Sequence, residues 1–368
     1  MKKTKDKTKS ELSVEEKLDL IKSFAEEIIN EDELRDLFKS KKKIIAYDGF
    51  EPSGQIHIAQ GLLRAITVNK LVKAGVNFKF WVADWFAMLN NKYGGDLDKI
   101  KIVGEYFVEV WRACGMDLDH VEFIWASAFI KEHPEYWETV LKLSMNASVN
   151  RVLRCGQIMG REESASNPSA QILYPLMQAS DIHNLGVDIA QLGLDQRKVN
   201  MLARDVFPKI GLKPPIAIHH HMLLGLQFKE SNLEGIERKI AMKMSKSKPE
   251  TAIFMTDTRK DILRKFKGAY CPEKEEKDNP VLEYAKYIVF EMFDKIEVKR
   301  DNKFGGDITL TGYDDLRDKY LNGKIHPLDL KATIAEYIDR LISPVRKHFE
   351  KGKPRELAEK VKKFQVTI

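Results

Sequence analysis

The clearest chemical signal in the chain is a short basic string in its C-terminal half. Lys243, Met244, Ser245, Lys246 and Ser247 follow one another without a break. Two ammonium groups and two hydroxyl groups on one loop can neutralise and hydrogen-bond the oxygens of a departing pyrophosphate. A fixed five-residue string has roughly a one in ten thousand chance of appearing in a chain of this length, so we interpret it as a phosphate clamp. The alternative interpretation is a solvated basic loop.

A second candidate phosphate site precedes it in the N-terminal part of the chain. Residues 54–61 read Gly-Gln-Ile-His-Ile-Ala-Gln-Gly, where an expected strand leads into an expected helix. Free N–H groups at a helix start attract phosphate, and His57 in the first turn can donate to a phosphate oxygen. A lone His more often packs structurally, but the two segments together are more specific than either alone. The chain has neither GxxxxGK[ST] nor GxGxxG, which argues against those two nucleotide-binding motifs.

A third feature is a stripe of hydrogen-bonding residues. Tyr174, Gln178 and Asp181 are spaced i, i+4 and i+7, on one face of a helix that we expect to begin at Pro175. Apolar residues usually occupy such a stripe. The stripe therefore predicts a buried polar pocket. A solvated helix face is the alternative, which five apolar neighbours argue against: Ile172, Leu173, Leu176, Met177 and Ile182.

The elements that must position these residues alternate between strands and helices, as in a parallel α/β sheet. A capping box at Ser13 and Glu16 predicts a first helix with four apolar residues on one face: Leu18, Ile21, Phe24 and Ile28. We expect strands at residues 43–47, 78–83, 121–125, 187–191 and 216–221, and helices at 31–40, 56–74, 97–114 and 196–206. Ligands of such sheets bind over the carboxyl ends of the strands.

The same pattern divides the chain into parts. We expect a disordered basic arm at residues 1–12, because five lysines and one Asp fall in the first ten residues without the apolar region of a secretory signal. Residues 13–255 form an α/β domain that contains a helical insertion at about 127–185 and the lysine loop at 241–250. Residues 256–368 are charged and mainly helical, which predicts a second, smaller domain.

Composition narrows the class of protein. The 368 residues are 43% hydrophobic and carry a net charge of +6, a mild excess that permits an anionic partner such as RNA. No apolar run approaches the ~18 residues needed to cross a bilayer, so we expect no membrane partner. Three widely spaced cysteines argue against a disulfide scaffold and fit a reducing compartment. Adjacent His219, His220 and His221 would point to alternate faces of a strand, so we expect no metal site there.

On these motifs the chain resembles the class I aminoacyl-tRNA synthetases. His57 to Gln60 and Lys243 to Ser247 are similar to the HIGH and KMSKS signatures of that class. Four further strings resemble the archaeal and eukaryotic type of tyrosyl-tRNA synthetase, from about residue 30 to the end of the chain: residues 47–54, 174–178, 195–198 and 326–331. The resemblance implies a Rossmann-like catalytic domain with a helical insertion, followed by a helical anticodon-binding domain.

The resemblance also implies an activity. Such enzymes activate L-tyrosine with ATP and Mg²⁺ to give tyrosyl-adenylate and pyrophosphate, and then charge the 3′ end of tRNA(Tyr). The implied contacts with the phenol hydroxyl of tyrosine are Tyr47 and Asp181, and those with its ammonium end are Tyr174, Gln178 and Gln196. Gly49 and Glu51 are also placed on tyrosine. The residues of the implied ATP site are Gly54, His57, Lys243, Ser245, Lys246 and Ser247. The expected catalytic groups are His57, Gln60, Lys243 and Lys246.

Nucleic acid and subunit contacts follow from the same resemblance. The implied tRNA contacts are Arg197, Phe304, His326 and Asp329, where stacking on the ring and a carboxylate on a guanine edge make physical sense. We expect a homodimer formed through the insertion, no DNA partner, no protein-held metal and a cytoplasmic location.

Two residues depart from the family pattern, and three other functions stay open. Gln60 stands where the second His of HIGH is expected, and Phe86 stands where many relatives carry His. The tryptophanyl enzyme shares the fold and both signatures, but an indole N–H is placed differently from the hydroxyl that Tyr47 and Asp181 would bind. A small-molecule adenylyltransferase lacks an RNA-binding tail. A non-catalytic tRNA-binding relative is expected to lose the lysine loop or the polar stripe.

Overall fold

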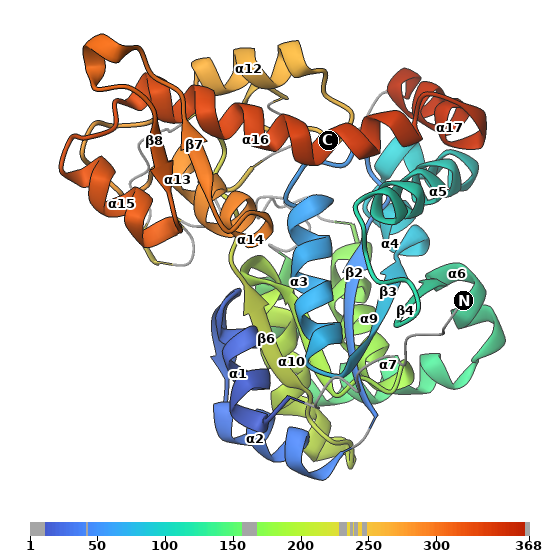
Figure 1. Ribbon diagram of the computed structural model, residues 1–368. Helices are drawn as coiled ribbons and strands as arrows, with labels where there is room; N and C mark the ends of the chain where they lie inside the picture. The colour runs from blue at the N-terminus through green and yellow to red at the C-terminus, as the bar shows by residue number, and fades with distance from the viewer. Residues whose placement is uncertain are drawn as a thin grey trace, which may run out of the picture.

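The computed structural model describes residues 12–41, 43–156, 168–227, 234–235, 238, 242–244 and 249–364. Its centre is a six-stranded sheet with the order β1-β6-β5-β2-β3-β4, in which only β1 runs antiparallel to its neighbour (Figure 1). The strands are β1 (Ala25–Ile29), β2 (Ile44–Phe50), β3 (Val76–Val82), β4 (Val121–Trp125), β5 (Ile189–Gly193) and β6 (Ile216–His220). The predicted Rossmann-like fold class is confirmed.

The strand order creates the crevice in which a ligand can bind. From β2 the chain moves outward to β3 and β4, and it then returns to the other side of β2 as β5 and β6. Connections that leave β2 and β5 in opposite directions open a crevice above their carboxyl ends. The residues that follow β2 and β5 therefore face one another across this crevice.

Helices cover both faces of the sheet. They are α1 (Val14–Lys22), α2 (Glu31–Ser40), α3 (Leu62–Lys73), α4 (Asp84–Leu89), α5 (Leu97–Ala113), α6 (Ala126–Glu132), α7 (Glu135–Asn146), α8 (Val149–Cys155), α9 (Ala170–Asn184) and α10 (Arg197–Val206). The helix α5 packs its aromatic face on the sheet, where Trp111 stacks on Phe80 with ring centroids 4.5 Å apart. This packing fixes the β2–β3 side of the crevice.

The C-terminal residues form a mainly helical part that lies across one end of the sheet (Figure 1). It comprises α12 (Arg259–Lys267), α13 (Pro280–Tyr284), α14 (Phe290–Met292), α15 (Tyr313–Leu321), α16 (Pro327–His348) and α17 (Gly352–Lys363), with a β-hairpin of β7 (Ile296–Val298) and β8 (Ile308–Leu310). His348 contacts Glu109 of α5 at 2.7 Å, and Lys353 contacts Glu105 at 2.8 Å. Helices α16 and α17 are thus tied to α5, which packs on the sheet.

Three expected elements differ in the structure. The first helix ends at Lys22, and Phe24 and Ile28 do not continue it, because residues 25–29 pair with β6 as an edge strand. The helix expected at 56–74 begins only at Leu62, so His57 lies in the turn before it. The helix expected to begin at Pro175 begins at Ala170, and Pro175 lies inside it. Tertiary pairing and packing override the local signals in each case.

Within the described part of the chain, no helix is long and apolar enough to span a membrane.

The contact between α5 and the sheet yields a stability prediction. A Cβ atom at Gly104 would lie 2.5 Å from Cη2 of Trp125 and 3.1 Å from Cγ1 of Val82. We expect Gly104→Val to lower the free energy of unfolding by about 1–3 kcal/mol, because the overpacked side chain must displace the sheet. Lys101→Val, at an exposed position of the same helix, is the control. Equal denaturation midpoints for the two variants would contradict this packing.

Candidate active site

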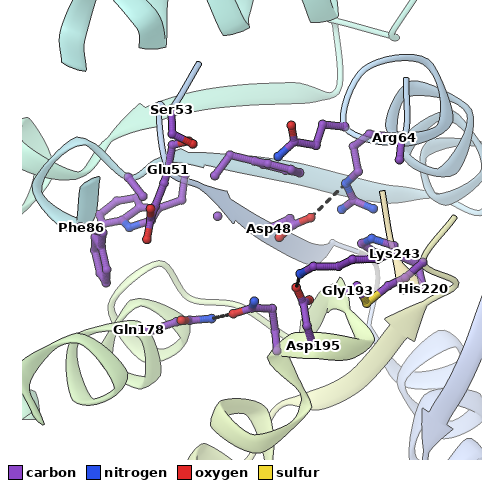
Figure 2. A pocket seen from close by; sticks show the side chains of 18 of the residues that line it. Asp48, Glu51, Ser53, Arg64, Phe86, Gln178, Gly193, Asp195, His220 and Lys243 are labelled. Carbon is purple, nitrogen blue, oxygen red and sulfur yellow. Dashed lines mark hydrogen bonds and ion pairs between the residues drawn. The ribbon is translucent and has the colours of Figure 1, made fainter. Parts of the chain in front are cut away.

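The crevice holds a cavity of about 360 Å³ over the carboxyl ends of the parallel strands (Figure 2). It is lined by ten of the residues that the sequence assigned to tyrosine, ATP or catalysis: Tyr47, Gly49, Glu51, His57, Gln60, Tyr174, Gln178, Asp181, Gln196 and Lys243. Ser245, Lys246 and Ser247 lie outside the described residues. Figure 2 shows Glu51, Phe86 and Gln178 at one end of the cavity, and Arg64, His220 and Lys243 at the other.

Backbone pairing brings the two signature segments to the same cavity. The N–H of Ile58 donates to the carbonyl of Ile253 (2.7 Å), and the N–H of Met255 donates to that of Ile56 (3.0 Å). On the other side of the lysine loop, the N–H of Met244 donates to the carbonyl of Leu223 (3.1 Å). The two ends of the loop are therefore anchored, one on the His57 turn and the other on the segment that follows β6.

His57 is buried beside this pairing. The backbone N–H of Gln60 donates to its Nδ1 at 3.4 Å. This contact assigns Nδ1 the role of acceptor and Nε2 the role of donor.

The predicted ATP residue Gly54 does not line the cavity. Its N–H donates to the hydroxyl of Tyr93, a residue with φ of +54° in a turn that also contains Gly94 and Gly95 at positive φ. A bulky residue with left-handed backbone carries strain of order 1–3 kcal/mol and persists only where its surroundings hold it. The hydroxyl of Tyr93 thereby occupies one of the donors expected to face phosphate.

One end of the cavity is lined by a hydrogen-bonded group of polar side chains. Glu51 accepts from the hydroxyl of Tyr174 (2.5 Å) and from the Asn90 side chain (3.0 and 3.1 Å). The Gln178 amide donates to Oε1 of Gln196 at 3.0 Å. The carboxylate and amide oxygens of these side chains are acceptors of the kind that an ammonium group requires.

Asp181, the carboxylate of the polar stripe, is more deeply buried than Glu51. Asp181 is 1% exposed, and its Oδ1 accepts from the hydroxyl of Tyr136 at 2.7 Å. Burial raises its pKa well above the usual range, and the Tyr136 hydrogen bond opposes that rise. Tyr47 is fully buried nearby, with its hydroxyl 3.4 Å from the carbonyl oxygen of Gln178.

The sequence did not identify the ion pair on the floor of the cavity. Nε of Arg64 lies 3.1 Å from Oδ2 of Asp48, and both side chains are at most 5% exposed. Burial raises the pKa of Asp48 to about 7 although Arg64 opposes the rise. The available signal was Arg64 itself, a charged residue inside the apolar run from Leu62 to Ile66.

Lys243, the first residue of the lysine loop's signature string, also forms an ion pair. Nζ of Lys243 lies 2.5 Å from Oδ2 of Asp195, which follows β5 (Figure 2). Asp195 belongs to one of the strings that resemble the family, but no role was predicted for it. This contact joins the lysine segment to the far wall of the crevice.

The residues predicted to contact tRNA are spread over two parts of the chain. Arg197 is held by Glu27 of β1 at 2.8 Å. Phe304 is 63% exposed, and His326 caps α16 by accepting from the N–H of Leu328. Arg300 donates to the carbonyls of Gly306 (2.9 Å) and Lys324 (2.8 Å), so the Phe304 turn and the start of α16, which carries Asp329, are linked.

The three adjacent histidines have internal partners. Nδ1 of His219 lies 2.8 Å from Glu27, and His220 contacts the Gln191 amide at 3.0 Å. His221 lies between Glu26 (2.9 Å) and Glu283 of α13 (3.2 Å), which together raise its pKa to about 9. It therefore carries a positive charge that bridges the sheet edge and the C-terminal part.

Comparison with known proteins places this fold and site in a family. Residues 39–343 match the family described as tRNA synthetases class I (W and Y). The chain belongs to that family and is an aminoacyl-tRNA synthetase, a class that uses ATP as substrate.

The similar proteins narrow this class further. The chain is 47% identical over 357 residues to cytoplasmic tyrosine–tRNA ligase 1 of Arabidopsis thaliana, covering 96% of this chain and 90% of that one. It is 43% identical to tyrosine–tRNA ligase of Saccharolobus islandicus, covering 97% and 99%. The predicted membership of the archaeal and eukaryotic type of tyrosyl-tRNA synthetase is confirmed.

Solved structures of tyrosyl-tRNA synthetases are also similar to this chain. The chain is 42% identical to Leishmania major tyrosyl-tRNA synthetase in complex with tyrosinol, with a TM-score of 0.87, and covers 61% of that longer chain. It is 38% identical to tyrosyl-tRNA synthetase of Pyrococcus horikoshii complexed with L-tyrosine, with a TM-score of 0.86 and complete coverage of that chain.

The buried Asp48–Arg64 pair yields a prediction that depends on pH. Arg64→Met leaves a buried carboxylate without its cation, and breaking such a pair costs about 3–5 kcal/mol. Because the folded-state pKa of Asp48 is raised, the carboxyl is neutral below that pKa and charged above it. The loss of stability should therefore be larger at pH 8 than at pH 6.

Thermal unfolding of the parent and Arg64→Met at both pH values measures this effect. The double variant Asp48→Asn/Arg64→Met removes both charges, and we expect it to be more stable at pH 8 than Arg64→Met alone. The prediction is wrong if the loss of stability in Arg64→Met is the same at both pH values and is not reduced in the double variant. The charge of Asp48 would then not depend on Arg64.

Proposed function

We propose that this chain activates L-tyrosine with ATP, forming tyrosyl-adenylate and pyrophosphate, and then transfers tyrosine to the 3′ end of tRNA(Tyr). One observation carries the proposal. A single cavity has His57 and Lys243 at the nucleotide side and the stripe of Tyr174, Gln178 and Asp181 at the amino-acid side. The division into a catalytic domain at 13–255 and an anticodon-binding domain at 256–368 belongs to the same proposal.

In the first step the tyrosine carboxylate attacks the α-phosphorus of ATP, and the bond to the β,γ-pyrophosphate breaks. The chain needs no covalent intermediate, because positioning and charge stabilisation supply most of the acceleration in such transfers. We assign phosphate contacts to the segment from His57 to Gln60, because Gly54 does not line the cavity and its N–H is paired with Tyr93. Lys243, with Ser245, Lys246 and Ser247, neutralises the departing pyrophosphate.

Mg²⁺ belongs to the ATP substrate in this proposal. No group of three or more His, Cys, Asp and Glu side chains that could hold a metal occurs among the described residues. The ion would bridge phosphate oxygens, for which it has a strong preference. It supplies charge neutralisation on the triphosphate, and the lysines of the loop act on the same oxygens.

Selection of tyrosine follows from the buried carboxylate. Asp181 and Tyr47 would contact the phenol hydroxyl, while Glu51, Tyr174, Gln178 and Gln196 would hold the ammonium. Gly49 also lines the cavity. A site built to hydrogen-bond a substrate hydroxyl rejects the analogue that lacks it, since the polar groups of the site would remain unpaired. Phenylalanine is such an analogue of tyrosine, so the site should discriminate against it.

In the second step the terminal ribose hydroxyl of tRNA attacks the tyrosyl carbonyl, and AMP leaves. We assign anticodon contacts to Phe304, His326 and Asp329. An exposed aromatic ring beside a helix start fits stacking of an unpaired base. Arg197 already pairs with Glu27, so a phosphate contact there would have to share or displace that carboxylate.

An exposed apolar stripe on α7 supports a homodimer through the insertion. Trp137, Leu141 and Met145 are spaced by four residues and are 39%, 63% and 84% exposed. Val149 and Leu173 extend the stripe onto α8 and α9. A contiguous exposed apolar patch marks an interface. We also propose a cytoplasmic location, which the free cysteines and the cytoplasmic Arabidopsis relative support.

Tyrosine-dependent exchange of pyrophosphate into ATP tests the proposal. We expect Asp181→Ala to raise KM for tyrosine by about tenfold or more, because a hydrogen bond to a charged group contributes roughly 1.5–3 kcal/mol. Lys246→Ala should instead lower kcat. Exchange with Trp and not Tyr would indicate a tryptophanyl enzyme, and tRNA binding without exchange a non-catalytic relative.

The subunit proposal has a separate test. Leu141→Glu places a charge in the centre of the apolar stripe, and we expect it to convert the dimer to a monomer in analytical ultracentrifugation, since an unpaired buried charge opposes association. Lys142→Glu, at the adjacent exposed position, is the control and should remain dimeric. A parent protein that sediments as a monomer would refute the dimer.

A further inference from the structure

Behind the polar stripe lies a tyrosine to which neither the sequence motifs nor the proposed reaction assigns a role. Tyr136 is in the first turn of α7 and is 0% exposed. Its hydroxyl lies 2.7 Å from Oδ1 of Asp181 and 2.8 Å from the carbonyl oxygen of Met177. Its own carbonyl accepts from the Ser180 hydroxyl at 3.2 Å. Helices α7 and α9 pack against each other (Figure 1), so this phenol joins α7 to the wall of the cavity.

The surroundings of Asp181 show what this contact does. The carboxyl is 1% exposed, and within the described residues no Lys, Arg or His forms an ion pair with it. A buried carboxylate without a cation is stabilised only by the donors that reach it. Tyr136 supplies such a donor to Oδ1, and this hydrogen bond opposes the rise that burial causes in the pKa of Asp181.

We propose that Tyr136 is a positioning residue for tyrosine selection: its hydroxyl fixes Asp181 so that the second carboxylate oxygen meets the phenol hydroxyl of the substrate. This inference rests on the proposed function. A single donor on Oδ1 restricts rotation of the carboxylate about its last bond. Oδ2 is thereby held as the acceptor at the end of a cavity that Asp181 lines.

The inference makes substrate selection depend on a residue outside the cavity. Without the Tyr136 hydroxyl, the carboxyl is free to rotate and gains a proton more easily, so it becomes a poorer acceptor for the substrate. Phenylalanine has no hydroxyl and uses neither oxygen of Asp181. Removal of the Tyr136 hydroxyl should therefore weaken activation of tyrosine and leave activation of phenylalanine almost unchanged.

Tyr136→Phe tests this in pyrophosphate exchange. We expect kcat/KM for tyrosine to fall about tenfold to hundredfold, through KM, in line with the strength of hydrogen bonds to charged groups. The preference for tyrosine over phenylalanine should fall by the same factor, while KM for ATP stays within about twofold. In an Asp181→Ala background, Tyr136→Phe should have no further effect on KM for tyrosine.

Ser180→Ala is the matched control. It removes a different hydrogen bond between α7 and α9 and leaves the Tyr136–Asp181 contact in place, so we expect parental KM values. Denaturation midpoints of both variants check that each is folded.

Three outcomes would overturn the proposal. Tyr136→Phe could have the KM for tyrosine of the parent, or it could raise KM for tyrosine and ATP together. It could also raise KM for tyrosine in the Asp181→Ala background as much as in the parent. A parent protein that exchanges with no tyrosine at all would instead refute the proposed function, which distinguishes the two failures.

Discussion

The whole arrangement depends on short backbone pairings that hold distant segments of the chain together. His57 and Phe254 form an antiparallel bridge, and Leu224 forms another with Lys243. These bridges fix the beginning and the end of the lysine loop on opposite sides of one cavity. Because buried backbone groups must be paired, these bridges hold Lys243 and Phe254, which flank the loop, in fixed positions.

The sheet makes these pairings possible. The turn that contains His57 follows β2, and the Leu223–Gly225 segment follows β6, so both emerge at the carboxyl edge. Asp195 follows β5 at the same edge and meets Lys243 from the opposite wall. Parallel strands thus gather residues from three separate regions of the sequence at one place. His221 and Glu283 then tie this edge to the C-terminal part.

Much of this could be predicted from the sequence, for physical reasons. Buried parallel strands have long apolar runs, and the signature strings carry unusual combinations of polar residues, so the fold class and ten cavity residues were found. The failures were contacts that involve residues far apart in the chain. The edge strand at 25–29 exists only because β6 offers it a partner, and an amphipathic pattern of Leu18, Ile21, Phe24 and Ile28 equally suits a helix.

The partners behind the cavity residues were missed for the same reason. Nothing local to Tyr136 or Tyr93 shows that one hydroxyl reaches Asp181 and the other reaches the N–H of Gly54. Arg64 could be recognised in the sequence, because a charged residue in an apolar helix needs a partner. Its partner Asp48 could be identified only from the three-dimensional structure. Local patterns identify which groups must be buried, and tertiary structure decides what satisfies them.

Three carboxyl groups of the site, the buried Asp48 and Asp181 and the half-buried Glu51, differ in their partners. Asp48 faces Arg64, whose guanidinium balances its charge within the protein. Glu51 and Asp181 each accept from a tyrosine hydroxyl, Tyr174 and Tyr136. Burial raises the pKa of both phenols well above the usual range, so they remain neutral donors. Each hydroxyl satisfies one carboxylate oxygen and leaves lone pairs of that carboxyl group to accept from a ligand. In the proposed function, these acceptors meet the ammonium group and the phenol hydroxyl of tyrosine.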